Sequence, residues 1–289
     1  MSLPLLVMTA CQTQPKLNYP ETAREDVTDN YFGTEVAEPY RWLENDTSAA
    51  TGEWVIAQNE LTYSYLDNIK FRPALKERLT KIYDYPKYGS PFKKNDKYYF
   101  FKNDGLQNQS VLYSQASLDA EPEVLLDPNK LSDDGTVALS QIAFSNNGKY
   151  LAYSIARSGS DWNEIYIMDL ATKTLLKDVI KWVKFSGIAW QADGFYYSAY
   201  DAPVAGKEFS NKNEYHKIYF HKVGDAQTAD KLVFENKKFP LRNCGAAVTD
   251  DEKYLVISET ESTSGNSLHI KDLSKPNAPL VTLEAGFEN

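Results

Sequence analysis

The sequence is poor in the residues that make covalent cross-links or bind metals. It contains two cysteines, Cys11 and Cys244, and three histidines among 289 residues. Two cysteines cannot form a disulfide framework or a thiolate metal site. The histidines also lack the i, i+4 spacing of a helical zinc motif. We therefore expect no metal site, and we interpret the histidines as structural.

Positive charge is in deficit as well. The chain has 31 lysines and arginines against 40 aspartates and glutamates, which gives a formal net charge of -9. A nucleic-acid-binding surface needs a basic stripe that displaces counterions. The basic residues here are dispersed, and the densest pair is Lys93 and Lys94. The composition thus predicts no nucleic-acid partner.

No apolar run reaches the roughly 20 residues that span a bilayer. Residues 3–10 form a shorter apolar run that ends in small residues before Cys11, which is typical of the end of a signal peptide. The ending Met-Thr-Ala-Cys resembles a bacterial lipobox, with Cys11 as the lipidated residue after cleavage. The alternative is a disordered tail with an incidental cysteine. We assign residues 1–16 to a signal-peptide remnant and linker. We expect an exported protein, periplasmic or associated with the outer membrane of a Gram-negative-type bacterium, with a lipid anchor as a further hypothesis.

Motifs that carry chemistry are missing too. The strained serine elbow of α/β-hydrolases has the pattern G-x-S-x-G, which does not occur. The nearest segment, residues 265–269, lacks the second glycine, so Ser267 is interpreted as structural. There is no phosphate-binding G-x-x-x-x-G-K-[ST] and no dinucleotide-binding G-x-G-x-x-G. The sequence predicts neither a nucleophile nor an organic cofactor in this chain.

Two helices are predicted near the start of the chain. Pro73 suits the first position of the second helix, where its missing N–H costs nothing, and Pro86 ends that helix. The apolar stripes of the two helices are Trp54, Ala57, Leu61, Tyr65 and Ile69, then Leu75, Leu79 and Ile82.

After Pro86 the pattern changes to short strands. Four related strands are expected at residues 97–102, 150–154, 195–198 and 254–258. The turns before them begin at Asn95, Asn147, Asp193 and Asp251, a spacing of 46 to 58 residues, close to the period of a four-stranded propeller blade. A second strand follows in each unit at 110–114, 164–169, 217–221 and 267–272, and each unit closes at 123–126, 175–176, 231–234 and 280–283.

The repeats indicate about four β-propeller blades. Twenty tyrosines agree with a sheet protein, and a β-sandwich would not give so long an internal period. Four blades can close a ring, but larger rings are common. Because the chain stops directly after a blade and the helices have no evident cover, we expect this sequence to be part of a longer protein.

Residues 31–44 (YFGTEVAEPYRWLE) closely resemble the opening signature of the prolyl oligopeptidases. The resemblance extends over roughly residues 19–283, with mild departures at Glu38, where the family usually has aspartate, and at Asn45, where a second acid is common. Its further blocks are residues 58–62, 103–113, 126–129, 158–162 and 183–190.

The resemblance implies a two-domain serine peptidase in which a seven-bladed propeller caps an α/β-hydrolase domain. It implies that residues 17–85 are a helical segment that packs on this absent domain. Residues 86–289 are then propeller blades one to four. The Ser-Asp-His triad would lie beyond Asn289, so this chain alone is expected to be inactive. Short proline-containing peptides are the implied substrates of the whole protein. A non-enzymatic propeller that serves as a scaffold or binding module is the alternative, and a G-x-S-x-G elbow encoded after Asn289 would distinguish the two.

The resemblance also suggests two residues that face substrate. Phe185 matches a family phenylalanine that adds apolar contact near the substrate; alternatively it is an aromatic residue of a blade core. Asp161 matches a family aspartate near the site entrance, where a carboxylate would attract a charged amino end; alternatively it caps a turn. Some relatives also carry an arginine and a cysteine in the fourth-blade loop, but residues 259–265 contain neither.

Overall fold

The computed structural model describes residues 17–263 and 265–287. The predicted signal segment and the candidate lipidation residue Cys11 lie outside the described residues, so their assignment stays a prediction. The chain divides into two compact units, the first ending at Tyr83 and the second beginning at Asp84. None of the helices in the described part is long and apolar enough to cross a membrane.

The first unit contains a hairpin, a 3-10 turn and two helices. Its elements are β1 (Thr28–Tyr31), β2 (Thr34–Ala37), η1 (Arg41–Glu44), α1 (Ala49–Asp67) and α2 (Arg72–Tyr83). The hairpin turns at Phe32 and Gly33, both with positive φ, as a two-residue turn between right-twisted strands requires. An ion pair from Arg41 to Asp29 connects η1 to the hairpin. The indole N–H of Trp42 donates to the Ala23 carbonyl over 2.9 Å. These contacts give Arg41 and Trp42 of the 31–44 segment a structural role.

Both predicted helices are present. Ser48 caps α1, because its hydroxyl accepts a hydrogen bond from the Thr51 N–H over 3.1 Å. The second helix begins one residue earlier than predicted, so Pro73 is its second residue, where the N–H also has no intrahelical acceptor. The apolar stripe of α2 is open to solvent, with Leu75, Leu79 and Ile82 exposed by 49%, 46% and 47%.

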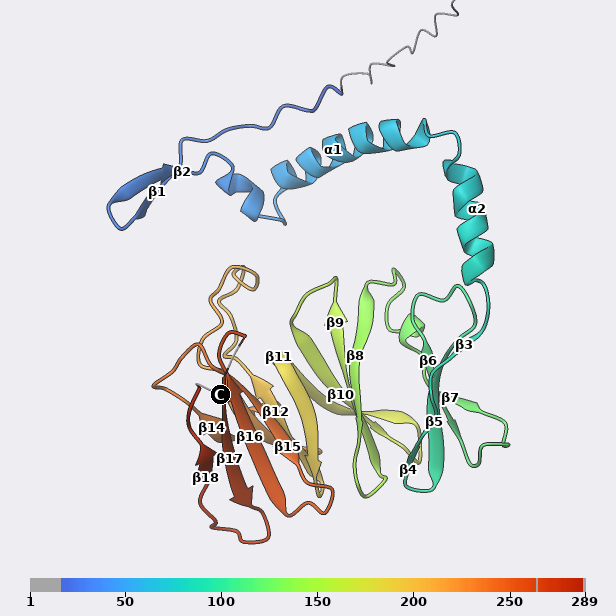
Figure 1. Cartoon of the computed structure of the whole chain (residues 1–289), viewed down its shortest axis with the longest axis vertical. Helices are drawn as coiled ribbons and strands as arrows, with labels where there is room; N and C mark the ends of the chain where they lie inside the picture. Colours follow the sequence, from blue (N-terminus) through green and yellow to red (C-terminus); the bar gives the residue numbers. More distant parts are fainter. Residues whose placement is uncertain (1–16, 264, 288–289) are drawn as a thin grey trace, which may run out of the picture. The chain divides into compact units, whose positions relative to one another are not determined.

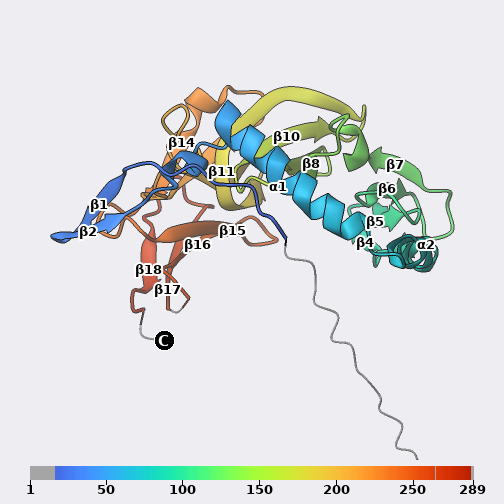
Figure 2. The same ribbon diagram turned by 90° about the horizontal axis from the view of Figure 1, so that it is seen from above.

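The second unit is a partial propeller of antiparallel sheets that follow one another around an arc (Figures 1 and 2). In the first sheet, β5 (Lys97–Asn103) pairs with β3 (Lys87–Tyr88), β4 (Phe92–Lys94) and β6 (Val111–Gln115), and β6 pairs with β7 (Glu123–Leu126). After the short η2 (Pro128–Lys130), the next sheet contains β8 (Val137–Phe144), β9 (Tyr150–Arg157), β10 (Asn163–Asp169), β11 (Thr174–Gln191), β12 (Gly194–Ala199), β13 (Lys217–Lys222) and, after η3 (Gln227–Ala229), β14 (Lys231–Glu235). The last sheet contains β15 (Asn243–Val248), β16 (Tyr254–Thr260), β17 (Asn266–Asp272) and β18 (Val281–Glu284).

The seven-stranded sheet is two blades joined by the long strand β11. The first half of β11 pairs with β10 up to Val183, and the second half pairs with β12 from Val183 to Gln191. The chain turns back between these halves, where Trp182 and Phe185 have φ of 60° and 50°. β11 is thus the outer strand of the second blade and the inner strand of the third.

Contacts at the two ends of these blades support this division. At one end the Asn147 amide lies 3.2 Å from the Asp193 carboxylate, which links two hairpin turns. At the other end the Trp162 ring packs edge-on against Tyr200. We call this second end, with residues 158–162, 182–187 and 200–216, the crossover end.

The four blades confirm the predicted fold class, a mainly β partial propeller preceded by a helical segment. All strands predicted for the four units are present, and all but one match within a few residues; the strand predicted at 175–176 is only the start of the longer β11. In the described part of the chain, no strand of the last sheet pairs with the first sheet, so these blades do not close a four-fold ring.

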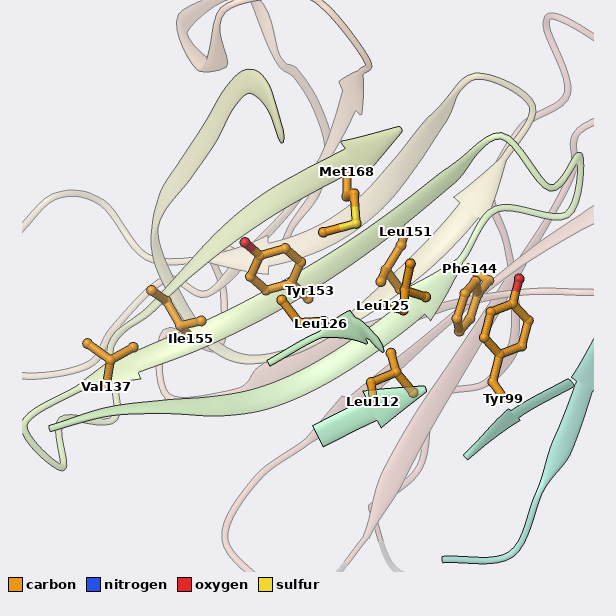
Figure 3. Close-up of a cluster of buried hydrophobic side chains, with 10 residues drawn as sticks. All are labelled: Tyr99, Leu112, Leu125, Leu126, Val137, Phe144, Leu151, Tyr153, Ile155 and Met168. Carbon is orange, nitrogen blue, oxygen red and sulfur yellow. The ribbon is translucent and has the colours of Figure 1, made fainter. Parts of the chain in front are cut away.

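Apolar side chains fill the space between successive blades. Figure 3 shows the first such cluster, in which Tyr99 and Leu112 from the first blade meet Phe144, Leu151 and Met168 from the second. Two further clusters lie farther along the arc, one around Ile165, Ile180 and Phe195 and one around Ile218 and Leu255. Since each blade buries its faces against its neighbours, the packing between blades holds the arc together.

Candidate functional site

Lys184 brings the two candidate residues together at the crossover end. Its ammonium nitrogen lies 3.7 Å from the Asp161 carboxylate and 5.4 Å from the centre of the Phe185 ring. The same nitrogen lies 5.0 Å from the Trp162 ring, close enough for a cation–π attraction. Asp161, Trp162, Lys184 and Phe185 form what we call the crossover cluster. Sequence reasoning missed Lys184 and Trp162 as members, although both lie in segments that carry the family resemblance.

Phe185 is at the surface rather than in a blade core. Its exposed fraction is 55%, and it lies in the turn at which the chain passes from the second blade to the third. Its φ of 50° is unusual for a residue other than glycine. The turn therefore presents the ring to solvent at the crossover end.

Asp161 does not cap its turn through its side chain. The hydroxyl of Ser160 accepts the hydrogen bond from the Trp162 N–H, over 3.0 Å. The Asp161 side chain is 72% exposed and pairs with Lys184, whose own side chain is only 11% exposed. The carboxylate is accessible, and an exposed ion pair of this kind contributes only about 0–1 kcal/mol.

Trp162 anchors the cluster to the long loop between β12 and β13. Its indole N–H donates to the Glu208 carbonyl over 2.8 Å. Its ring packs edge-on against Trp182 and Tyr200, with centroids 5.6 and 6.2 Å apart. These contacts hold the β12–β13 loop, the turn that contains Trp162 and the strand residue Trp182 in one arrangement around Lys184.

His216 fixes the backbone of Lys184. Its Nδ1 accepts from the Cys244 N–H over 3.0 Å, so its Nε2 carries the proton and donates to the Lys184 carbonyl over 2.9 Å. Burial lowers the pKa of His216 to about 4. Burial also raises the pKa of the Cys244 thiol to about 12. The pair is thus neutral and structural, and it connects the crossover cluster to the fourth blade.

The segment nearest to a serine elbow carries a buried polar group. Ser267 is 2% exposed on β17, and its hydroxyl donates to Glu259 Oε2 over 2.5 Å. His269 Nε2 lies 3.0 Å from the same carboxylate oxygen. A catalytic serine would direct its proton to the histidine from an exposed turn, so Ser267 is structural. Among the described residues, no group of three or more histidine, cysteine, aspartate or glutamate side chains is placed to hold a metal.

Two cavities lie near the cluster. One of about 580 Å³ is lined by the inner strands of all four blades and includes Phe92, Phe144, Trp190 and Val248. A smaller one of about 200 Å³ has Phe185 and Ser186 in its lining. The crossover cluster thus borders a partly polar hollow between the second and third blades.

Comparison with known proteins identifies the fold family. Residues 19–288 match the family described as prolyl oligopeptidase, N-terminal beta-propeller domain. A prolyl endopeptidase of Elizabethkingia meningoseptica is 47% identical over 281 residues, covering 97% of this chain and 40% of the relative. Prolyl oligopeptidase A of Amanita bisporigera is 36% identical over 302 residues, covering 93% of this chain and 39% of the relative.

Solved structures give the same result. Prolyl oligopeptidase B from Galerina marginata, bound to a 35mer hydrolysis and macrocyclization substrate, superposes with a TM-score of 0.81 at 30% identity. The match covers 95% of this chain and 42% of that chain. The chain therefore spans about 40% of the length of the curated relatives described above.

Proposed function

Because this chain belongs to the prolyl oligopeptidase family, we propose that it is the propeller-bearing part of a serine endopeptidase that cleaves short peptides after proline. The observation that carries the proposal is the 47% identity to a prolyl endopeptidase along 97% of the chain. The serine, aspartate and histidine are assigned to a C-terminal α/β-hydrolase portion, since the chain spans 40% of that relative. The buried state of Ser267 supports this assignment.

In this proposal the propeller controls access to the catalytic portion. It admits flexible peptides and rejects folded proteins, because a folded domain does not fit past the blades. The open apolar stripe of α2 supports a further covering domain, since burying a leucine or isoleucine side chain yields roughly 1.5–3 kcal/mol. The proposal needs no metal and no organic cofactor.

The crossover cluster is proposed to face the bound peptide. Phe185 supplies an apolar contact, and Asp161 attracts the charged amino end of the peptide. The weak pair between Asp161 and Lys184 suits this role, because the carboxylate can exchange one cation for another at little cost.

We expect the 289-residue chain alone to release no product from a proline-containing chromogenic peptide. The longer protein that includes the C-terminal portion is expected to hydrolyse the same peptide through an acyl-enzyme, with serine as nucleophile and histidine as base. A fluorophosphonate should abolish that activity. Fluorophosphonate-sensitive turnover by the 289-residue chain would show that the nucleophile lies within it. A longer protein that binds partner proteins but cleaves no peptide would favour the scaffold function.

Phe185→Ala in the longer protein is expected to lower kcat/KM about tenfold and leave stability nearly unchanged. Burial of a phenylalanine against peptide is worth roughly 1.5–3 kcal/mol, and a partly wet contact should give the lower value, about one decade in rate. An exposed ring leaves no void when it is removed. Steady-state kinetics measure the change in kcat/KM, and thermal unfolding of the same preparation measures the change in stability.

Phe195→Ala provides the contrasting variant, because Phe195 is fully buried between blades. It should cost about 3–5 kcal/mol of stability. If Phe185→Ala instead showed this stability loss with unchanged kinetics, Phe185 would have a packing role.

A further inference from the structure

Gln141 lies where three cavities meet. It lines the cavities of about 580 and 200 Å³ described above and a further one of about 410 Å³ between the first and second blades. In the described part of the chain, it is the only residue that these three linings share. The smallest cavity also has Phe185 in its lining. Gln141 and a candidate substrate contact therefore border the same space.

A β-bulge precedes Gln141 on β8. Leu139 pairs with Ile155 and Gln141 pairs with Ser154, so Ser140 is an extra residue on its strand. Such bulges re-aim side chains and are common beside functional sites. Gln141 is partly exposed, and among the described residues its carboxamide has no hydrogen-bond partner. The carboxamide is thus available to a molecule that enters the cavities.

Two other glutamines of this propeller show what such a carboxamide does when a backbone lies beside it. Gln109 Nε2 donates to the Val137 carbonyl over 2.7 Å, and its Oε1 accepts from the Leu139 N–H over 2.8 Å. Gln227 makes the same two bonds to the carbonyl and N–H of Lys181, both over 3.0 Å. A glutamine side chain carries both donors and an acceptor, so it pairs with a main chain as a neighbouring strand would.

We propose that Gln141 binds the main chain of the peptide substrate, with its Oε1 accepting from a peptide N–H and its Nε2 donating to a peptide carbonyl. The inference rests on the proposed peptidase function and adds a main-chain contact to it. The residue before a proline favours an extended conformation, which leaves main-chain groups of the peptide open to such pairing. Main-chain hydrogen bonds provide affinity without reading side chains, which suits peptides that have only the proline in common.

The test uses the longer protein and alanine peptides in which one alanine before the proline is replaced by N-methylalanine. The methyl group removes one N–H donor. At one position it should lower kcat/KM more in the wild type than in Gln141→Met, by roughly threefold to tenfold, the range of one neutral hydrogen bond. Methionine is similar in length to glutamine but has no carboxamide. Each protein is compared with its own rate on the unmethylated peptide, so a general effect of the substitution on catalysis cancels.

Two further variants complete the test. Gln141→Glu keeps the oxygen acceptor and loses the N–H donors, so it should keep the sensitivity to methylation; this variant carries the test if Gln141→Met fails to fold. Gln115→Met is the control. Gln115 on β6 is also partly exposed, its carboxamide has no hydrogen-bond partner among the described residues, and it lines none of the three cavities. Its response to methylation should equal that of the wild type.

If methylation lowers kcat/KM equally in the wild type and Gln141→Met at every position, Gln141 accepts no hydrogen bond from the peptide and the inference is overturned. Loss of the sensitivity in Gln141→Glu would also contradict it. If the longer protein cleaves no proline peptide, the proposed function fails and the inference fails with it. The failures are distinguishable, because the first two leave cleavage after proline intact.

Discussion

Replacement of His221 by leucine is expected to lower the free energy of unfolding of the propeller unit by about 3–5 kcal/mol, the usual cost of breaking a buried charge group. His221 is fully buried between two carboxylates, with Nδ1 2.7 Å from Asp230 and Nε2 3.0 Å from Asp178. Asp178 belongs to the second blade and the other two residues to the third, so the trio connects the blades. Leucine would leave two buried carboxylates without their shared cation.

The same trio predicts a pH dependence. Burial alone would lower the pKa of His221, but hydrogen bonds to Asp230 and Asp178 outweigh it and raise the pKa above the ordinary value. Both ring nitrogens can donate only when the imidazole is protonated. A raised folded-state pKa means that the stabilisation is complete below the unfolded value of about 6.5 and is lost as pH rises through the folded value.

Urea unfolding of the 289-residue chain between about pH 6 and 9 measures this pH dependence of stability. The wild-type midpoint should fall with rising pH, and His221→Leu should lack that part of the slope. Adding Asp178→Asn and Asp230→Asn to His221→Leu should recover part of the lost stability, since no buried charge then stays unpaired. Equal slopes for wild type and His221→Leu would show that His221 is neutral in the folded protein.

The sequence predicted the strands that carry large alternating side chains. The strand pairs of each blade stand out because tyrosine, phenylalanine and isoleucine alternate between Asn/Asp/Gly turns. The inner strands gave no such signal. β15 (Asn243–Val248) has the sequence NCGAAV, whose mostly small side chains carry little periodicity; Ala246, Ala247 and Val248 line the cavity of about 580 Å³. β11 was predicted only in part, because its two halves serve two blades.

The candidate site was only partly predictable, for a different physical reason. Phe185 and Asp161 were found through family resemblance, whereas their connection through Lys184 depends on chain segments 23 residues apart folding to the same end of the blade. The contact between His221 and Asp178 spans 43 residues and two blades. Such pairings follow from how the blades stack, and no local pattern encodes them.

Replacement of Glu259 by leucine is expected to destabilise the fourth blade by about 3–5 kcal/mol. Glu259 is 1% exposed. It accepts hydrogen bonds from Ser267 Oγ over 2.5 Å and from Asn236 Nδ2 over 2.6 Å. Arg242, whose guanidinium lies 3.7 Å from this carboxylate, is 11% exposed. Leucine would leave several buried polar groups and part of a cation without a partner.

The stabilisation that Glu259 provides depends on pH, and the negative charge of its carboxylate sets the direction of that dependence. Burial would raise the pKa of this carboxyl, but hydrogen bonds from Ser267, Asn236 and His269 and the nearby Arg242 charge outweigh it, and the pKa is lowered. The stabilisation is therefore present above the unfolded value of about 4.3 and is lost as pH falls through the lower folded value. Glu259→Gln, which keeps the shape but not the charge, should remove this acid dependence at a smaller cost of roughly 1–3 kcal/mol.

Glu261→Gln is the matched control, because Glu261 is the other carboxylate partner of Arg242, at 3.2 Å, and is 41% exposed. An exposed pair contributes about 0–1 kcal/mol, so this variant should unfold almost as the wild type does. Urea unfolding at pH 7 of the three variants should rank them Glu259→Leu, Glu259→Gln and Glu261→Gln, from least to most stable. If Glu261→Gln cost as much as Glu259→Leu, the exposed ion pair rather than the buried hydrogen bonds would hold Arg242. If all three variants matched the wild type, the buried network would contribute nothing to the stability of the blade.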